Sequence, residues 1–192
     1  MARVSREQAR LNRERVVEVA SRLFRERGYQ GIGIADLMAE AGLTHGGFYN
    51  NFTSKDALAG EACAYAFGDT DFDLAVSAGK QEPGSLAALV DAYLSPSHRA
   101  RPGTGCPLPA LAADAAREPQ GSPLRHSFTA GLTAMVDRVA AVLPTATKAR
   151  RRKRALGSIA TLVGAIALAR AVDDDDLADE ILEAARAAAI PG

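Results

Sequence analysis

Apolar residues near the start of the chain repeat at the spacing of one helix face. Four of them fall at i, i+4, i+7 and i+8: Val16, Ala20, Leu23 and Phe24. This spacing places them in one stripe along a helix. Gly28 follows, and glycine is common just beyond a helix end. The pattern therefore predicts a helix from about residue 6 to Arg27.

Two shorter apolar patterns follow the first helix. Ile34–Ala41 places its apolar residues on one face of a short helix. Thr44 is a good N-cap for a second short helix over His45–Phe52, because its hydroxyl can accept from a free backbone N–H. Ser54 offers the same cap to a further helix beginning at Lys55.

The rest of the chain is predicted to form helices separated by loops. Proline, glycine and serine mark breaks at 79–84 and 95–109, and no stretch has the alternation of a strand. Helices are expected at 58–78, 85–94, 110–117, 124–143, 148–172 and 177–189. The predicted fold is all-α, with about nine helices.

The two short helices and the turn between them have the pattern of a helix-turn-helix. Gly42 can supply the left-handed backbone that a tight turn between helices needs. Leu37 and Phe48 are among the apolar residues that would hold the two helices together. The opposite side of the second helix carries His45, Gly46, Gly47, Tyr49, Asn50 and Asn51. Such a face can enter the major groove of DNA.

Charge is unevenly distributed, although the chain has 23 basic and 23 acidic residues and no net charge. Residues 1–30 contain eight arginines and four glutamates, whereas residues 171–192 contain seven acidic residues and one arginine. The basic end could face an anion such as DNA, with Arg3, Arg6 and Arg10 as an arm. Solvated helix faces and a solvated tail explain the same charges equally well.

The two cysteines and the longest apolar run bear on location. Cys63 and Cys106 are far apart in sequence, which implies no disulfide framework and fits a reducing compartment. The arginine-rich start lacks the apolar stretch of a secretion signal. The run Ala155–Ala169 is too short to span a bilayer. These features predict a cytoplasmic protein with one buried apolar helix.

The order and spacing of residues 10–58 make the helix-turn-helix pattern specific. The residues concerned are Gly28-Tyr29, Ile34-Ala35-Asp36-Leu37, Ala41-Gly42-Leu43-Thr44, the run from His45 to Phe52, and Ser54-Lys55-Asp56-Ala57-Leu58. This arrangement resembles the DNA-binding signature of the TetR family. The chain departs from that signature at Gly33, where the family often has Ser or Thr, and at Asn50-Asn51, where aromatic residues or histidine are common. The helix cap and the base preference are therefore open.

The resemblance implies DNA contacts for eight residues. The phosphate-binding group would be Thr44, Tyr49, Asn51 and Lys55, and the group nearest the bases would be His45, Gly46, Gly47 and Asn50. A lysine at a helix N-terminus suits a phosphate, and an asparagine can pair with adenine. The alternatives are a core position for Tyr49 and an exposed position without DNA contact for His45.

The resemblance also implies two domains and a homodimer. Residues 1–54 would form the helix-turn-helix DNA-binding domain, and residues 55–192 a ligand-binding and dimerisation domain. The last two helices commonly form a four-helix bundle across a two-fold axis in the family, and Gly157 and Gly164 would permit close approach. An intrachain core is the alternative. The basic run Lys148–Arg154 fits a solvated helix start better than a DNA contact.

No motif identifies the ligand. The candidate residues are Tyr65, Phe67, Tyr93, Cys106, His126 and Phe128, with Phe72, His98 and Met135 as further candidates, and any of them can be plain core. Their few charges suggest a mostly apolar ligand. Gly105-Cys106-Pro107 resembles a subgroup of the family in which some members sense electrophiles or unsaturated small molecules. A thiol near a helix N-terminus has a lowered pKa, which would suit such sensing. An inert buried cysteine is the alternative.

The function implied by the resemblance is ligand-responsive repression of transcription from a palindromic operator. A ligand- or redox-dependent activator of the same fold and an architectural DNA-binding protein stay open. The sequence disfavours an enzyme, because it has no nucleophile elbow and no paired metal motif. Its three histidines are too scattered to indicate a metal site. No cofactor and no membrane partner are expected.

Overall fold

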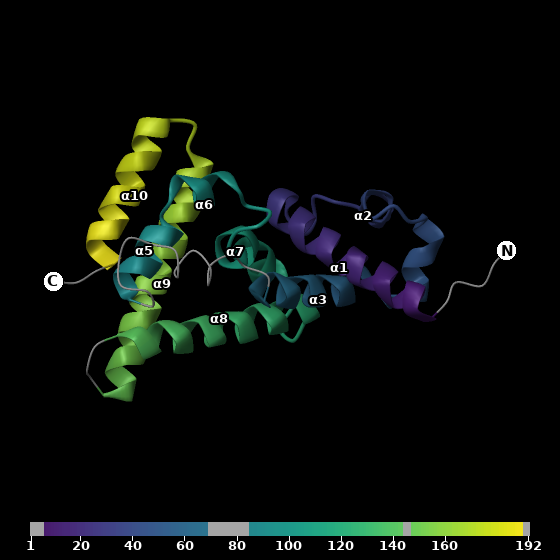
Figure 1. Cartoon of the computed structure of the whole chain (residues 1–192), viewed down its shortest axis with the longest axis horizontal. Coiled ribbons are helices and arrows are strands. Elements are labelled where there is room, and N and C mark those ends of the chain that lie inside the picture. Colours follow the sequence, from purple (N-terminus) through teal and green to yellow (C-terminus); the bar gives the residue numbers. More distant parts are fainter. Residues whose placement is uncertain (1–5, 69–84, 144–146, 190–192) are drawn as a thin grey trace.

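The computed structural model describes residues 6–68, 85–143 and 147–189, and every regular element in these ranges is a helix. The bounds are α1 Arg6–Arg27, α2 Ile34–Glu40, the 3-10 helix η1 His45–Asn50, α3 Lys55–Gly68, α5 Leu86–Tyr93, α6 Pro96–Ala100, α7 Pro107–Arg117, α8 Pro123–Val142, α9 Lys148–Ala171 and α10 Asp175–Ala189. The all-α prediction is confirmed for the described residues. Figure 1 shows α1 and α2 at one end of the molecule and α9 and α10 at the other.

The N-terminal helices pack around fully buried side chains. Phe48 of η1 and Leu37 and Met38 of α2 are each 0% exposed. The chain turns between α2 and η1 at Gly42, where φ is 69°. A Cβ is disfavoured at this angle, so the tight turn depends on glycine. These elements form the helix-turn-helix that the sequence predicts.

The second helix of this motif differs from the expected α-helix over His45–Phe52. It is a 3-10 helix that ends at Asn50, and the N–H of Asn51 donates to the carbonyl of Phe48 at 2.9 Å. Gly46 and Gly47 have low α-helical propensity, which favours this short, tight form.

Helix α3 connects the N-terminal helices to the rest of the molecule. It packs against α1 on one side and α8 on the other (Figure 1). Gly60 permits the contact with α8, because a Cβ at this position would lie 2.8 Å from the Cβ of Pro123. The apolar core around α1 continues across α3 to Leu111 and Leu124. The domain boundary at residue 54 stays a prediction.

A second apolar core lies among α5, α8, α9 and α10. Leu162 and Ile166 of α9 are 2% and 0% exposed and face this core, together with Leu182 of α10. Leu156 and Leu168 of the same helix are 44% and 58% exposed. Helix α9 therefore has one buried and one open apolar face.

The loop expected at 95–109 contains helical segments at both ends. Ser95 accepts from the N–H of His98 and starts α6, with Pro96 in its first turn. Pro107 likewise lies in the first turn of α7. Proline is favourable there because the first helical N–H has no partner within the helix. The prolines therefore start helices, and the described residues contain ten helical segments instead of about nine.

The helix expected over 58–78 forms α3 as far as Gly68, while its remaining part and the break at 79–84 lie outside the described residues. Among the described helices, α9 alone is long and apolar enough to cross a membrane by length and composition, and only 33% of its apolar window is buried. A helix that serves in the core of a soluble protein passes the same test, so this is weak evidence for a membrane span.

Candidate DNA interface

We call the segment from Ile34 to Lys55 the reading unit. It holds η1 with one face inward and one face outward. Phe48 forms the inward side and packs against Phe52, with ring centroids 5.5 Å apart. Because this aromatic contact fixes the rotation of η1, the other residues of the helix are turned towards solvent.

The outward face contains most of the residues expected near DNA. Thr44, His45, Gly46, Tyr49 and Asn50 are exposed, and Gly47 is half-buried. Tyr49 is 64% exposed, so it is not a core aromatic. Its ring lies edge-on to Phe48 at 5.2 Å and to His45 at 6.4 Å. The structure thus brings these six residues together on one small surface.

The two glycines of η1 are not required by contacts within the chain. A Cβ on Gly46 would meet nothing within 4 Å, and one on Gly47 would only touch Met38 and Thr44 at ordinary distances. Neither glycine has a positive φ. What these glycines provide is a bare stretch of backbone on an exposed face, which suits close approach to a large partner.

Asn51 and Lys55 have partners inside the protein. The Nδ2 of Asn51 donates to the carbonyl of Gly47 at 2.8 Å and so holds η1 together. The Nζ of Lys55 donates to the carbonyl of Tyr29 at 2.7 Å and lies 4.6 Å from the centre of its ring. Burial lowers the pKa of Lys55. Both side chains support the reading unit, and their phosphate contacts stay predictions.

The start of α3 is tied to the loop after α1 by a further contact. The hydroxyl of Tyr29 donates to Asp56, and burial, with this carboxylate next, raises the pKa of Tyr29. The backbone N–H of the same tyrosine donates to Asp114 of α7 at 3.0 Å. Tyr29 therefore joins the loop after α1 to both α3 and α7.

Three of the seven arginines of α1, namely Arg10, Arg13 and Arg22, are paired with glutamates. Arg10 bonds Glu7 and Glu14, and Arg22 bonds Glu26 and Glu40. Such exposed pairs contribute little to stability, but they reduce the positive charge available to DNA. Arg6 lies at the exposed start of α1, and Arg3 lies outside the described residues.

Sequence reasoning missed the role of Arg13, which joins α1 to two other elements. Its guanidinium pairs with Glu61 of α3 at 2.6 Å and lies 4.8 Å from the centre of the Phe52 ring. The partners are 48 and 39 positions away, so no local pattern could have indicated these contacts.

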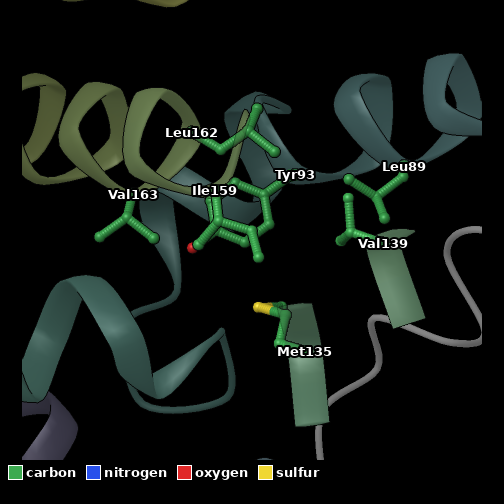
Figure 2. Close-up of a pocket in the computed structure, with 7 residues that line it drawn as sticks. All are labelled: Leu89, Tyr93, Met135, Val139, Ile159, Leu162 and Val163. Atoms are coloured by element: carbon green, nitrogen blue, oxygen red, sulfur yellow. The ribbon is translucent and has the colours of Figure 1, made fainter. Parts of the chain in front are cut away.

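The six expected ligand residues do not gather at one place. Tyr93 lines a small cavity with Met135, Leu162 and neighbouring apolar residues (Figure 2). The volume of this cavity is about 10 Å³, which is room for about one water molecule. Phe67 and Phe128 pack edge-to-face at 6.3 Å. Tyr65 is 36% exposed on α3, and His126 is exposed on α8.

Cys106 is buried, and its thiol does not have the expected lowered pKa. The residue is 2% exposed at the start of α7, and burial raises its pKa despite the nearby helix N-terminus. Its backbone N–H donates to the Nε2 of His98 at 3.0 Å. This environment favours the inert reading of Cys106 over a reactive sensor. In the described part of the chain, no group of three or more His, Cys, Asp or Glu could hold a metal ion.

The exposed polar η1, held by a glycine turn against α2 and carried on an all-helical body, defines a helix-turn-helix DNA-binding protein. Residues 16–62 match the family described as bacterial regulatory proteins, tetR family. These residues therefore carry the DNA-binding region of the TetR family, on a body with the fold of TetR transcriptional regulators.

Two curated relatives match the DNA-binding region. The HTH-type transcriptional repressor DhaR of Mycobacterium sp. (strain GP1) is 40% identical over 57 residues, which are 30% of this chain and 29% of the relative. The uncharacterized HTH-type transcriptional regulator YerO of Bacillus subtilis (strain 168) is 38% identical over 56 residues, 29% of this chain and 19% of the relative. The match thus spans less than a third of each relative.

Solved structures match over nearly the whole chain. A TetR transcriptional regulator from Chloroflexus aurantiacus J-10-FL is 27% identical, with a TM-score of 0.72 and 94% of each chain covered. A TetR-family regulator from Cytophaga hutchinsonii is 22% identical, with a TM-score of 0.74 and coverage of 96% of this chain and 95% of that one. The second likeness shows the shared fold alone.

Proposed function

We propose that the protein is a ligand-responsive transcriptional repressor that binds a palindromic operator as a homodimer. The observation that carries the proposal is the outward face of η1, where His45, Tyr49 and Asn50 are exposed around two glycines that no internal contact requires. Thr44 and Tyr49 would contact phosphates, and His45 and Asn50 would lie nearest the bases.

The open face of α9 supports the proposed dimer. Leu156 and Leu168 are exposed on it, and a Cβ on Gly157 or Gly164 would meet nothing within 4 Å. Leu177, which lies in the first turn of α10 and follows α9 closely in the sequence, is 42% exposed. An apolar face with small residues can pack closely against a second copy and form a bundle of four helices. This face lies at the end of the molecule opposite to α2 (Figure 1).

A dimer built in this way would present two reading units to one duplex. Half-sites one turn of DNA apart, about 34 Å, would be read together. Helix α3 packs on both α1 and α8, so a change in the body can alter the spacing of the two units. A coupling of about 1–3 kcal/mol would be enough to switch binding. We place the protein in the cytoplasm, where the DNA is.

Selection of duplexes from a random pool tests the proposal. The expected product is a two-fold symmetric sequence, and a reporter carrying it upstream should be repressed by the protein. Asn50→Ala should alter the base preference in each half-site, while Thr133→Ala, an exposed change on α8, should not. Selected duplexes without two-fold symmetry, or activation of the reporter, would contradict the proposal.

A further inference from the structure

A broad cleft opens where the end of α1 meets α6, α7 and α9. Its volume is about 770 Å³, against about 10 Å³ for the small cavity beside Tyr93. The charged side chains along it are Arg25, Glu26, Arg99, Arg170 and Asp175. Its other walls are proline and alanine side chains. The cleft therefore combines apolar walls with an excess of one positive charge.

The two carboxylates of the cleft are already paired. Glu26 accepts from Arg22 at 3.2 Å, and Asp175 accepts from Arg99 at 2.8 Å. Neither of these carboxylates is within ion-pair distance of Arg170. The negative charge in the cleft is thus neutralised by other arginines.

Arg170 is held in place without a counter-charge. Its Nε donates to the carbonyl of Arg99 at 3.0 Å, and its Nη2 donates to the carbonyl of His98 at 2.5 Å. Within the described residues it makes no ion pair with a carboxylate. The side chain is half-buried, and burial lowers its pKa.

A half-buried charge without a counter-ion is unfavourable, and an anion supplied by a ligand would relieve that cost. Two backbone carbonyls fix the plane of the Arg170 guanidinium and leave Nη1 available. A planar carboxylate is the group that such a fixed guanidinium binds best. The proline and alanine walls suit the apolar body of the same molecule.

We propose that this cleft binds a small organic acid, with its carboxylate on Arg170 and its apolar body against the proline and alanine walls. The role of this cleft as an effector site rests on the ligand-responsive function proposed above. The proposed ligand differs from the mostly apolar ligand that the sequence suggests in carrying a carboxylate.

The cleft also has a direct connection to the DNA-binding end of the molecule. Arg25 of α1 lines it, and its Nη1 donates to the carbonyl of Gly105, just before α7, at 2.7 Å. The same guanidinium donates to Ser21 on its own helix. An acid in this cleft would lie beside the bond that joins α1 to the start of α7, and α1 packs directly on α2.

Binding is tested on the full chain with sodium benzoate, neutral benzamide and inorganic phosphate as probes. Thermal unfolding and calorimetry should give a saturable response to benzoate and none to benzamide, which has the same shape without the charge. The response to phosphate should be smaller than the response to benzoate, because phosphate has no apolar body. Equal responses to benzoate and benzamide overturn the carboxylate contact, and an equal response to phosphate overturns the organic acid.

Two pairs of variants and one control variant locate the site. Arg170→Met should weaken benzoate binding about tenfold or more, and Arg170→Lys should weaken it less. Arg186→Met breaks an ion pair with Asp91 outside the cleft lining and should leave binding unchanged. Because Arg170→Met also removes bonds to two carbonyls, Ala100→Glu serves as an independent test. Ala100 is exposed and lines the cleft, so a carboxylate there should repel benzoate while Ala100→Gln should not. Unchanged binding in Arg170→Met or, if that variant does not fold, in Ala100→Glu overturns the inference.

The same samples separate this inference from the proposed function. If the protein binds a two-fold symmetric duplex but shows no charge-selective response to benzoate, the cleft proposal fails and the repressor proposal stands. If benzoate binds selectively but no symmetric duplex is preferred, the site stands and the operator proposal fails. If both hold, benzoate should weaken duplex binding in the wild type and not in Arg170→Met.

Discussion

The reading unit and the arginine-lined cleft place their polar groups in opposite ways. In the reading unit, the groups proposed to meet DNA lie between positions 44 and 50 and point outward from one buried aromatic, Phe48. In the cleft, Arg25, Arg99 and Arg170 come from three distant segments and are held by backbone carbonyls. A site built from neighbours in sequence can be recognised from its spacing, whereas a site built by packing cannot.

The largest expected effect comes from removing the aromatic that holds the reading unit. Phe48→Ala should lower the free energy of unfolding by about 3–5 kcal/mol, because a fully buried ring leaves a cavity. Urea unfolding followed by circular dichroism measures the change. Tyr49→Ala is the matched control: it is 64% exposed and should cost at most about 0.5 kcal/mol while still weakening DNA binding. Similar losses of stability in both variants would contradict the inward and outward division.

The open face of α9 gives the next largest effect. Leu156→Glu with Leu168→Glu should convert the dimer to a monomer and weaken binding to a symmetric duplex about a hundredfold or more, because one reading unit must then bind alone. Sedimentation and fluorescence anisotropy measure the two changes. Tyr65→Glu places a single glutamate at an exposed position on α3 and should leave the dimer intact. A double variant that stays dimeric would show that the copies meet elsewhere.

His98 should make stability depend on pH. Its Nε2 accepts from the N–H of Cys106 and its Nδ1 contacts the carbonyl of Tyr93, so the folded protein requires the neutral ring. Burial lowers the pKa of His98 below 6.5, so at acid pH the unfolded chain binds the proton more readily than the folded one. The free energy of unfolding should therefore fall as pH drops through 6.5 towards the folded pKa, by about 1.4 kcal/mol for each unit that separates the two pKa values.

Unfolding midpoints in urea between pH 7.5 and 5 test this dependence. His98→Gln should flatten it, while His126→Gln, at an exposed position on α8, should preserve it. If the pH dependence survives in His98→Gln and disappears in His126→Gln, His126 and not His98 is its source, and the prediction is wrong.

The smallest expected change is in the salt dependence of DNA binding. Lys55→Met removes the ammonium and keeps an aliphatic side chain, and it should lower the slope of log K against log salt by about one unit if Lys55 leaves Tyr29 for a phosphate. Anisotropy titrations at several salt concentrations give the slope. An unchanged slope together with a less stable protein would assign Lys55 to a purely structural role.

Much of the fold could be predicted because its signals are local. The start of α3 follows from Ser54, whose side chain accepts from the N–H of Ala57, and the turn before η1 follows from Gly42. The prolines at 96 and 107 were misleading because proline, as a residue type, can either end a helix or occupy the first turn of one. Which of the two occurs depends on the packing around it.

The roles of single residues could be predicted less well. Asn51 and Lys55 belong to the recognised motif, yet both are bonded inside the protein, and a motif does not reveal which partner a side chain prefers. The hypothesis of a reactive Cys106 rested on its place at a helix N-terminus, and burial in the body outweighs that effect and favours the inert alternative. The contact of Arg25 with Gly105 joins residues 80 positions apart, so no local sequence pattern could have predicted it.

Gly60 has a consequence for how movement passes through the molecule. A Cβ on Gly60 would lie 2.8 Å from the Cβ of Pro123 and 3.0 Å from its carbonyl, so α3 has no room for a side chain of its own where it crosses the beginning of α8. A side chain in that place could change rotamer and absorb a small displacement, but bare backbone cannot. A shift of α8 at this crossing is therefore passed on to α3, because no side chain at position 60 can absorb it.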